Sequence, residues 1–187
     1  KEISIWWADD PSETFTPPGH SYSIAKIAIK TANSKLDQAL ESYAKTGISV
    51  TDAFICCWKV KFTYNNIRPY SYVRKAIDPE WIPFWPAPPF PGFSSGHATQ
   101  SAASAVVLES VYGKNFAFTD NTWEGRAKDT KRNTEFKPRK LPSLWAAAQE
   151  SALSRFLGGI HTTMDNNAGL EQGKKIGENV LTLQFKK

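Results

Sequence analysis

The sequence has 187 residues, enough for one domain with a substantial hydrophobic core, and we expect residues 1–187 to form a single domain. Hydrophobic residues make up 41% and charged residues 22%, as in ordinary globular proteins, and no apolar run approaches the roughly 18 residues of a transmembrane helix. The net charge of +5 comes from scattered basic residues, so neither nucleic acid nor a membrane is expected as a partner. The compartment stays open, with a periplasmic or secreted location favoured over the cytoplasm.

The N-terminal part of the chain divides into an irregular segment and two helices. Residues 1–19 combine tryptophans and acidic residues with prolines that break both the helical and the strand period, so we expect an irregular docking segment. Apolar residues at three- and four-residue steps predict a short helix over about 20–32 and a longer one over about 36–65. Lys61 would lie near the end of the longer helix, with Arg68 just beyond it.

Two adjacent cysteines, Cys56 and Cys57, fall within the longer helix. Adjacent cysteines rarely bond to each other, and the sequence contains no third cysteine. We therefore expect both to be buried free thiols.

The middle of the chain begins with residues 76–93, which are rich in proline and aromatic residues and fit neither a helix nor a strand. Long loops of this kind often carry function, so we expect this one to lie over a site. The next helix should begin near Ser95 or Gly96 and end near Tyr112. Residues 113–141 are polar and basic and predict a solvated excursion outside the core.

Helical spacing returns over about 143–158 and 163–183. In the second of these helices, Gly169 and Gly173 fall on one face, where small residues would permit close helix packing. No convincing strand alternation or internal repeat is present. The fold class predicted is all-α, an antiparallel helical bundle.

Three short segments contain the residues best suited to chemistry, and the first is Ser94–His97. At a helix start, the backbone amides of Ser95, Gly96 and His97 would lack intrahelical acceptors and would lie at the positive end of the helix dipole. Such a place binds anions, although a serine-rich helix start is more often only a cap.

The second segment contains Arg155, His161 and Asp165. His161 and Asp165 are one helical turn apart, so the carboxylate can hold one imidazole nitrogen and leave the other directed into a site. Taken alone, the segment would more often contain a satisfied buried histidine and a surface arginine.

The third segment supplies Lys61 and Arg68, which alone would be solvated surface charges. The conjunction of the three segments changes this interpretation. Three cations, two histidines, a hydroxyl group and a glycine amide are the groups that hold a tetrahedral oxyanion and move protons on it.

These segments resemble the signature of the type 2 phosphatidic acid phosphatase and vanadium haloperoxidase superfamily: Lys, six residues, Arg-Pro; Pro-Ser-Gly-His; and Ser-Arg, five residues, His, three residues, Asp. The residues that match are Lys61, Arg68, Pro69, Ser95, Gly96, His97, Ser154, Arg155, His161 and Asp165. The one departure is Ser94, where the family usually has proline, a residue that presets the turn and does not touch the substrate. The resemblance implies the helical bundle of the acid phosphatase and vanadium haloperoxidase type.

The resemblance to the haloperoxidase branch covers most of the chain. Residues 6–10, followed by Thr16-Pro17-Pro18, are similar to the segment that precedes the bundle in that branch, where Asp10 would pair with Arg155. Trp58 and Phe90 resemble residues that line the pocket above the vanadate, although alone they would equally suit core packing. Some bromide-oxidising relatives carry histidine at the Phe90 position, which favours a chloride- or iodide-type pocket.

The resemblance implies a role for each site residue. Vanadate would be the cofactor, with His161 as the vanadium ligand, and phosphate or sulfate would fit the same place. The groups that would hydrogen-bond the oxyanion are Lys61, Arg68, Ser95, Gly96, His97 and Arg155. His97 would act as acid and base when hydrogen peroxide binds, and Lys61 would polarise the bound peroxide for attack by halide, which releases hypohalous acid. Asp10 and Asp165 would support the site from behind, and small organic molecules are further candidate substrates.

Two other functions use the same residues. In a soluble acid phosphatase, His161 would attack phosphorus to form a phosphohistidine, Asp165 would orient it, and His97 would protonate the leaving alcohol. Lipid phosphatases of the superfamily are usually integral membrane proteins, which favours the haloperoxidase branch for this chain. A module that only binds phosphate would leave His97 idle.

Haloperoxidases of this branch are normally longer, with a second helical half upstream. We therefore expect residues 1–187 to be the C-terminal catalytic part of a longer haloperoxidase. An upstream fragment or subunit would complete the bundle and cover apolar residues such as Ile3, Ile5, Trp6 and Trp7.

Overall fold

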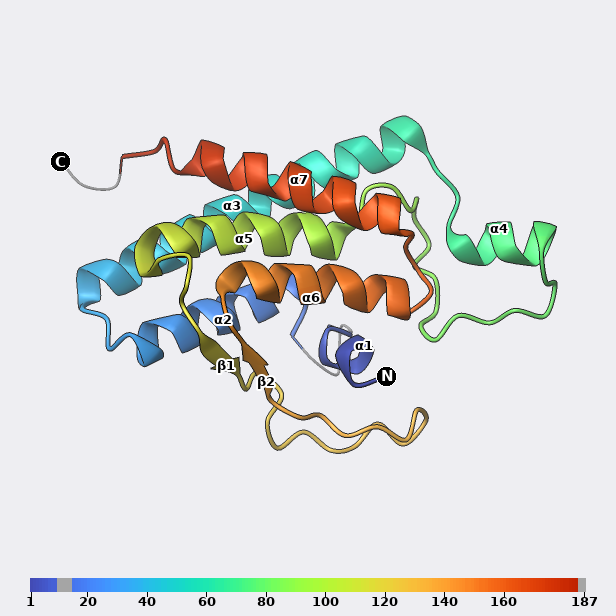
Figure 1. Ribbon diagram of the computed structural model, residues 1–187. Helices are drawn as coiled ribbons and strands as arrows, with labels where there is room; N and C mark the ends of the chain where they lie inside the picture. Colours follow the sequence, from blue (N-terminus) through green and yellow to red (C-terminus); the bar gives the residue numbers. More distant parts are fainter. Residues whose placement is uncertain (10–14, 185–187) are drawn as a thin grey trace.

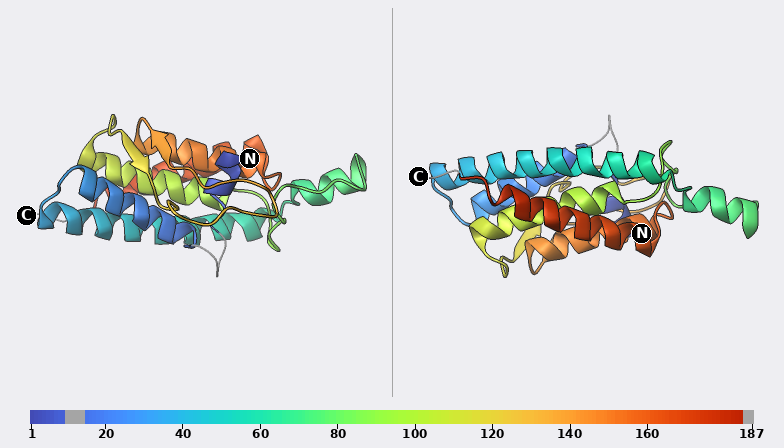
Figure 2. Two further views of the ribbon diagram at one scale, coloured as in Figure 1. Left: turned by 90° about the horizontal axis from the view of Figure 1, so that it is seen from below. Right: turned by 90° about the horizontal axis from the view of Figure 1, so that it is seen from above.

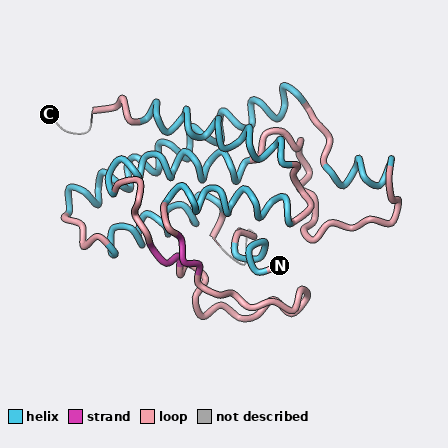
Figure 3. Tube along the Cα trace, in the orientation of Figure 1, coloured by secondary structure: helices cyan, strands magenta, loops and turns pink. Residues whose placement is uncertain are grey.

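The computed structural model describes residues 1–9 and 15–184. Within these ranges the chain is mostly helical, with one small antiparallel sheet, as Figure 3 shows. The elements are α1 (Glu2–Trp6), α2 (Pro17–Thr31), α3 (Leu36–Tyr64), α4 (Pro69–Ala76), α5 (Gly96–Tyr112), β1 (Phe118–Asp120), β2 (Arg139–Leu141), α6 (Leu144–Leu157) and α7 (Thr163–Val180). The predicted all-α helical bundle is confirmed.

The central element is α5, which packs against α2, α3, α6 and α7 (Figure 1). All residues from 98 to 105 are buried, and they are alanine, serine, threonine and glutamine. A helix that is covered on every side needs small or apolar residues all round rather than one apolar stripe. The start of α5, which carries the Ser-Gly-His motif, therefore leads directly into the buried centre of the bundle.

A line of glycines on α7 brings this helix unusually close to α5. A methyl group added at Gly169 would lie 2.7 Å from the carbonyl oxygen of Ser95, and one added at Gly173 would lie 2.0 Å from that of Thr99. Neither position can hold a side chain unless the helices separate. The predicted close packing is confirmed, and it sets the start of α7 against the start of α5.

The N-terminal segment differs from the prediction. Residues 1–19 were expected to be irregular, but Glu2–Trp6 form α1 and Pro17 already begins α2. The first proline comes only at Pro11, so nothing interrupts a helical turn before it, and proline suits the first turn of a helix. Ile5, Trp6 and Trp7 are each 1% exposed, so the bundle of this chain already covers them.

The segment 113–141 was predicted to be a solvated excursion, and this prediction is wrong at both of its ends. Phe118, Trp123 and Leu141 are buried in the main core cluster. β1 and β2 pair antiparallel, with Phe118 opposite Leu141, and the Trp123 indole donates to the backbone oxygen of Trp6. Three-residue strands are too short to show the alternation by which strands are recognised in a sequence.

α4 was not expected as a separate helix, and it projects from one end of the bundle (Figure 2). Pro69 occupies its first turn, where the missing N–H costs nothing. None of its residues is buried. Among the described residues, no helix is both long and apolar enough to cross a membrane.

The cysteines partly match the prediction. Both are free thiols, but only Cys57 is buried, while Cys56 is exposed. Consecutive residues of a helix point about 100° apart, and this rotation turns Cys56 away from the core that Cys57 faces.

Candidate functional site

The predicted site residues lie at the ends of four packed helices, at the end of the bundle from which α4 projects (Figure 1). Lys61 is in the last turn of α3, Arg68 is the N-cap of α4, and Arg155 is in the last turn of α6. Ser95 is the N-cap of α5, and His161 directly precedes Thr162, the N-cap of α7. The predicted positions of Lys61 and Arg68 relative to the long helix are confirmed.

Lys61 is fully buried, and its ammonium group donates to two backbone oxygens of the proline-rich loop. The acceptors are Pro91 at 2.9 Å and Gly92 at 2.8 Å. An ammonium group has three donors, so one remains for another acceptor. Burial, with a further contribution from Arg68, lowers the pKa of Lys61 to about 8.

Arg68 is 5% exposed and lies between the proline-rich loop and His161. Its Nε donates to the Phe90 oxygen at 2.9 Å, and one terminal nitrogen donates to the Ile160 oxygen at 2.9 Å. The other terminal nitrogen is buried and has no hydrogen-bond partner. Burial, with a contribution from Arg155, lowers the pKa of Arg68 to about 10, so the group remains a cation with an unused donor.

His161 and Asp165 form the predicted pair, with Nδ1 of the imidazole 3.3 Å from the carboxylate. The Asp165 carboxylate also accepts the Thr162 amide in a capping box, which fixes its position. The other imidazole nitrogen, Nε2, lies 3.0 Å from an Arg68 nitrogen that can only donate. Nε2 therefore carries a lone pair that points toward the cations.

The protonation of His161 is set by its surroundings. Burial, together with the charges of Arg68 and Lys61, lowers the pKa of His161 to about 3, against the opposing effect of Asp165. The imidazole is therefore neutral at physiological pH, which is the form that can bond through its lone pair.

The start of α5 offers fewer free amides than the sequence suggested. The Ser95 amide donates to the backbone oxygen of Asp165 at 3.0 Å, so this amide is not available to an anion. The Ser95 hydroxyl accepts the Ala98 amide as a helix cap. Gly96 and His97 occupy the next positions, where a helix provides no acceptor for the backbone N–H groups.

Two aromatic rings form a wall beside the cations. The centroids of Trp58 and Phe90 are 5.2 Å apart. The Phe90 centroid lies 5.4 Å from the Lys61 nitrogen and 5.0 Å from the central guanidinium carbon of Arg68. The Trp58 centroid lies 5.8 Å from the same Lys61 nitrogen, so both rings are beside a predicted cation, while their place in a pocket stays a prediction.

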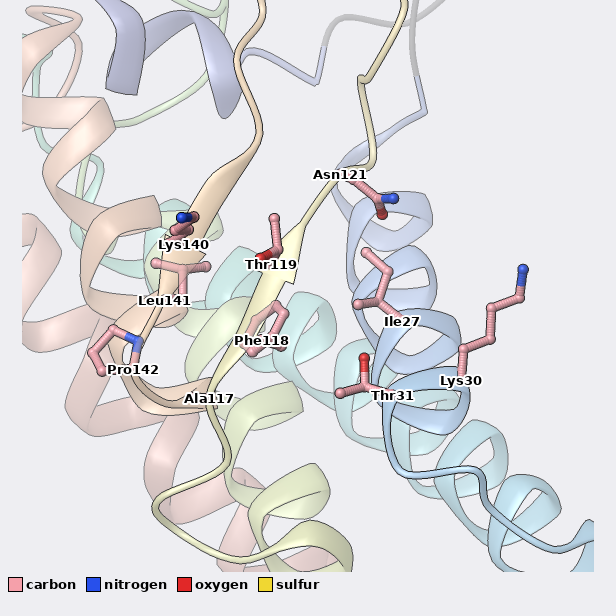
Figure 4. Close-up of a pocket in the computed structure, with 10 residues that line it drawn as sticks. All are labelled: Ile27, Lys30, Thr31, Ala117, Phe118, Thr119, Asn121, Lys140, Leu141 and Pro142. Atoms are coloured by element: carbon pink, nitrogen blue, oxygen red, sulfur yellow. The ribbon is translucent and has the colours of Figure 1, made fainter.

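A cleft of about 520 Å³ opens beside His161. Its other lining residues come from α4, the proline-rich loop and the helix ends: Pro69, Val73, Trp81, Phe156, Gly159, Thr162, Thr163 and Met164. A separate open hollow of about 760 Å³ lies between α2 and the two strands, and none of the predicted site residues lines it (Figure 4).

His97 has a partner that the sequence did not reveal. Its Nε2 lies 3.2 Å from one carboxylate oxygen of Asp9, and the other oxygen of Asp9 lies 2.9 Å from His20. His20 in turn contacts Asp120 on β1 at 2.9 Å. Burial, with a contribution from Arg155, lowers the pKa of His97 to about 4, against the opposing effect of Asp9. The chain has only three histidines, so His20 at the start of a helix was a signal that could have been followed.

Arg155 is 4% exposed and is held in place by Ser154 and by the backbone oxygen of Trp7. The predicted partner of Arg155, Asp10, lies outside the described residues, so this pairing stays a prediction. Arg155 lowers the pKa values of both Arg68 and His97, so this third cation lies near both of them, at the same site.

The donor set fits an oxyanion. A buried guanidinium nitrogen without an acceptor, an ammonium group with an unused donor and a histidine lone pair converge at the bundle end. Among residues 1–9 and 15–184, no cluster of histidine, cysteine and carboxylate side chains is arranged to hold a metal cation. Vanadate, like phosphate, is an oxyanion and would be held by donors and by one histidine.

Comparison with solved structures gives the same fold. The crystal structure of the first bacterial vanadium-dependent iodoperoxidase superposes with a TM-score of 0.87 at 38% sequence identity, over 98% of this chain and 43% of that one. A holo-type bacterial vanadium-dependent chloroperoxidase superposes with a TM-score of 0.69 at 16% identity, over 96% of this chain and 43% of that one.

Comparison of sequences agrees with the structural likeness. The vanadium chloroperoxidase of Curvularia inaequalis is 27% identical over 214 aligned positions, which cover 86% of this chain and 35% of that protein. This chain thus spans well under half the length of these relatives. The family model for the "VCPO second helical-bundle domain" matches residues 41–186. The chain therefore belongs to the vanadium-dependent haloperoxidase family.

Proposed function

We propose that this chain carries the catalytic site of a vanadium-dependent haloperoxidase, which converts halide, hydrogen peroxide and a proton to hypohalous acid and water. When bound, vanadate would supply a Lewis-acidic centre that activates hydrogen peroxide toward halide. Hydrogen peroxide and halide are then the substrates, and small organic molecules that accept the halogen are further candidates.

The observation that carries the proposal is the unpaired terminal nitrogen of Arg68 beside the Nε2 lone pair of His161. A buried donor without an acceptor is costly, so its persistence indicates that a ligand supplies the acceptor. The lone pair alongside it is the group that would bond to vanadium. A tetrahedral oxyanion would accept from the unpaired Arg68 nitrogen, and its vanadium would take the Nε2 lone pair that the other Arg68 nitrogen now contacts.

The remaining cations would neutralise the charge of the oxyanion. Lys61 contributes its third N–H from a position fixed by the loop carbonyls, and the amides of Gly96 and His97 contribute from the start of α5. Because Arg68 lowers the pKa of Lys61, and Arg155 that of Arg68, the cations repel one another until an anion is present. Anion binding should therefore be strong and should stabilise the fold.

Proton movement would fall to His97. Its pKa of about 4 leaves it neutral at physiological pH, so it can take a proton from hydrogen peroxide and return it to a leaving oxygen. Trp58 and Phe90 would keep bulk water away from the cations. For the halide, we favour iodide, because the structural relative at 38% identity is an iodoperoxidase.

We also propose that an upstream segment or a subunit completes the bundle. This chain spans less than half the length of its relatives, which supports the proposal. Large apolar side chains remain exposed along α3, just after α4 and in the following loop, notably Leu36, Ile55, Phe62, Ile77 and Ile82. A second helical half would cover them.

The test is halide oxidation by the chain after removal of bound anions and reconstitution with orthovanadate. Iodide, bromide and chloride are assayed in parallel with hydrogen peroxide, and thermal unfolding is recorded with and without vanadate. Activity only with vanadate, together with a higher unfolding temperature, would support the proposal. Hydrolysis of a phosphate monoester that vanadate inhibits would instead assign the chain to the acid phosphatases of the superfamily.

A further inference from the structure

Behind His97, four side chains form a continuous hydrogen-bonded line into the core. His97 Nε2 contacts Asp9 at 3.2 Å, Asp9 contacts His20 Nδ1 at 2.9 Å, and His20 Nε2 contacts Asp120 at 2.9 Å. The side chains of Asp9, His20 and Asp120 are 0% exposed, whereas that of His97 is 16% exposed. The line therefore has one end at the site and the other in the core.

The contacts of His20 determine its protonation state. Both ring nitrogens face carboxylate oxygens, and an ionised carboxylate can only accept. Each nitrogen must therefore carry a hydrogen, which makes His20 an imidazolium ion. Burial alone would lower the pKa of His20, but Asp9 and Asp120 outweigh this effect and raise it to about 10.

The far end of the line is itself well anchored. Asp120 accepts the Trp6 indole N–H at 2.7 Å as well as the amide and hydroxyl group of Thr122. The Trp7 ring stacks on His20, with ring centroids 4.4 Å apart. Asp120 and His20 consequently have little freedom to rotate, and water is kept from the pair.

This anchoring has a consequence for His97. With His20 positively charged, Asp9 stays ionised, and its remaining oxygen can only accept from His97 Nε2. Neutral His97 is then restricted to the tautomer that carries hydrogen on Nε2, which leaves the lone pair on Nδ1. Without the charge on His20, Asp9 would lose the strongest of the interactions that favour its ionised form.

We propose that His20 and Asp120 are positioning residues, which hold the Asp9 carboxylate so that His97 is fixed in its Nε2–H tautomer. The role of that tautomer in turnover rests on the proposed function, but the tautomer itself does not. The contacts of His161 complete the set, and the three histidines occupy three different protonation states. His20 is doubly protonated, His97 carries hydrogen on Nε2, and His161 carries it on Nδ1.

The decisive experiment is long-range ¹H–¹⁵N NMR of the histidine rings in the vanadate-free chain at pH 7. Three histidines give three ring systems, which single substitutions assign. We expect one imidazolium pattern from His20 and two neutral patterns with opposite tautomers from His97 and His161. A neutral His20, or a mixture of tautomers at His97, would overturn the proposal.

Substitutions then test the coupling. In His20→Gln we expect His97 to lose its single Nε2–H state and to become charged or mixed. Asp120→Asn, which keeps the shape of the side chain and the histidine ring, should act in the same direction and carries the test if His20→Gln does not fold. An unchanged His97 tautomer in a folded variant would refute the coupling.

A matched control separates positioning from packing. Ser21 neighbours His20 on α2 and makes another buried hydrogen bond to α5, from its hydroxyl group to Gln100 at 2.8 Å. Ser21→Ala should leave the His97 tautomer unchanged, and an equal effect in this variant would show that packing alone is responsible. With vanadate, His20→Gln should lower kcat at least tenfold while vanadate affinity changes less than threefold. If the unsubstituted chain oxidises no halide, the proposed function fails, but the NMR result still decides the positioning role.

Discussion

His161 and His97 lie at the starts of two helices in contact, yet they are held in different ways. The carboxylate partner of His161 is four residues away in the sequence, and its other nitrogen faces cations. The partner of His97 is 88 residues away and is itself held by a histidine and a second carboxylate. One histidine thus directs a lone pair toward cations, while the other is backed by fixed charge. In the proposed function this difference would separate anion binding from proton transfer.

The largest expected effect comes from removing each histidine in turn. His161→Ala should lower vanadate affinity by at least about 100-fold, because it removes the proposed vanadium ligand itself, and loss of a group that merely supports a ligand already costs about 10- to 100-fold. His97→Ala should retain vanadate binding and lose turnover. Isothermal titration with vanadate and the halide assay measure the two quantities, and similar affinity losses in both variants would erase the contrast between the histidines.

Arg68 offers the next test, since it touches only the anion-binding side. Arg68→Ala should weaken vanadate binding by about 10- to 100-fold, the value of a charge-assisted hydrogen bond. Arg68→Lys should be only partly effective, because an ammonium group cannot donate to Ile160 and to an anion in the same planar arrangement. Arg74→Ala, on the exposed face of α4, is the control and should bind normally.

The contact between α5 and α7 keeps the two histidines in register, and Gly173 tests it. Gly173→Ala should destabilise the fold by about 1–3 kcal/mol, because the new methyl group meets the Thr99 oxygen. Alanine in an exposed helix position would instead stabilise by about 1 kcal/mol relative to glycine. Urea unfolding measures the change, with Lys174→Ala as the control. A stabilised Gly173→Ala variant would show that the helices can separate freely.

The smallest expected effect is the change in the free energy of unfolding per pH unit that the charge on His20 causes. Because its pKa rises from 6.5 in the unfolded chain to about 10, its contribution to stability is complete below pH 6.5 and is lost as the pH rises. The free energy of unfolding should fall by up to about 1.4 kcal/mol per pH unit. The window from about pH 7 to 8 is best, because the lowered pKa values of His97 and His161 make stability rise with pH below it. Lys61, with its pKa lowered to about 8, acts in that same opposing direction above the window.

Urea unfolding of the vanadate-free chain at several pH values within this window checks the slope. His20→Gln should remove it, whereas Ser21→Ala should retain it. A slope that persists in His20→Gln would mean that another group is responsible.

Local sequence patterns predicted the binding side of the site well. The helix bounds, the caps at Ser95 and Thr162 and the pairing of His161 with Asp165 all depend on residues within a few positions of one another. Spacing along one helix converts directly into distance, so such contacts can be inferred before the fold is known.

The proton-transfer side could not be predicted in this way. Asp9 lies in the segment after α1, His20 on α2 and Asp120 on β1, and the contact from His20 to Asp120 spans 100 residues. Asp120 lies on a three-residue strand within a polar stretch whose composition suggested exposure. Only the packing of β1 against α2 and the tryptophans of the N-terminal segment turns that aspartate inward.

The helix ends also affect the order in which the chain could fold and bind the proposed oxyanion. Lys61 and Arg155 lie in the last turns of α3 and α6, where the carbonyl ends of the helices stabilise a cation even if no anion is bound. The starts of α5 and α7 face the same region and favour negative charge. If the proposed function holds, these helix ends would let the chain fold before it binds an oxyanion, so vanadate would be acquired by a folded site.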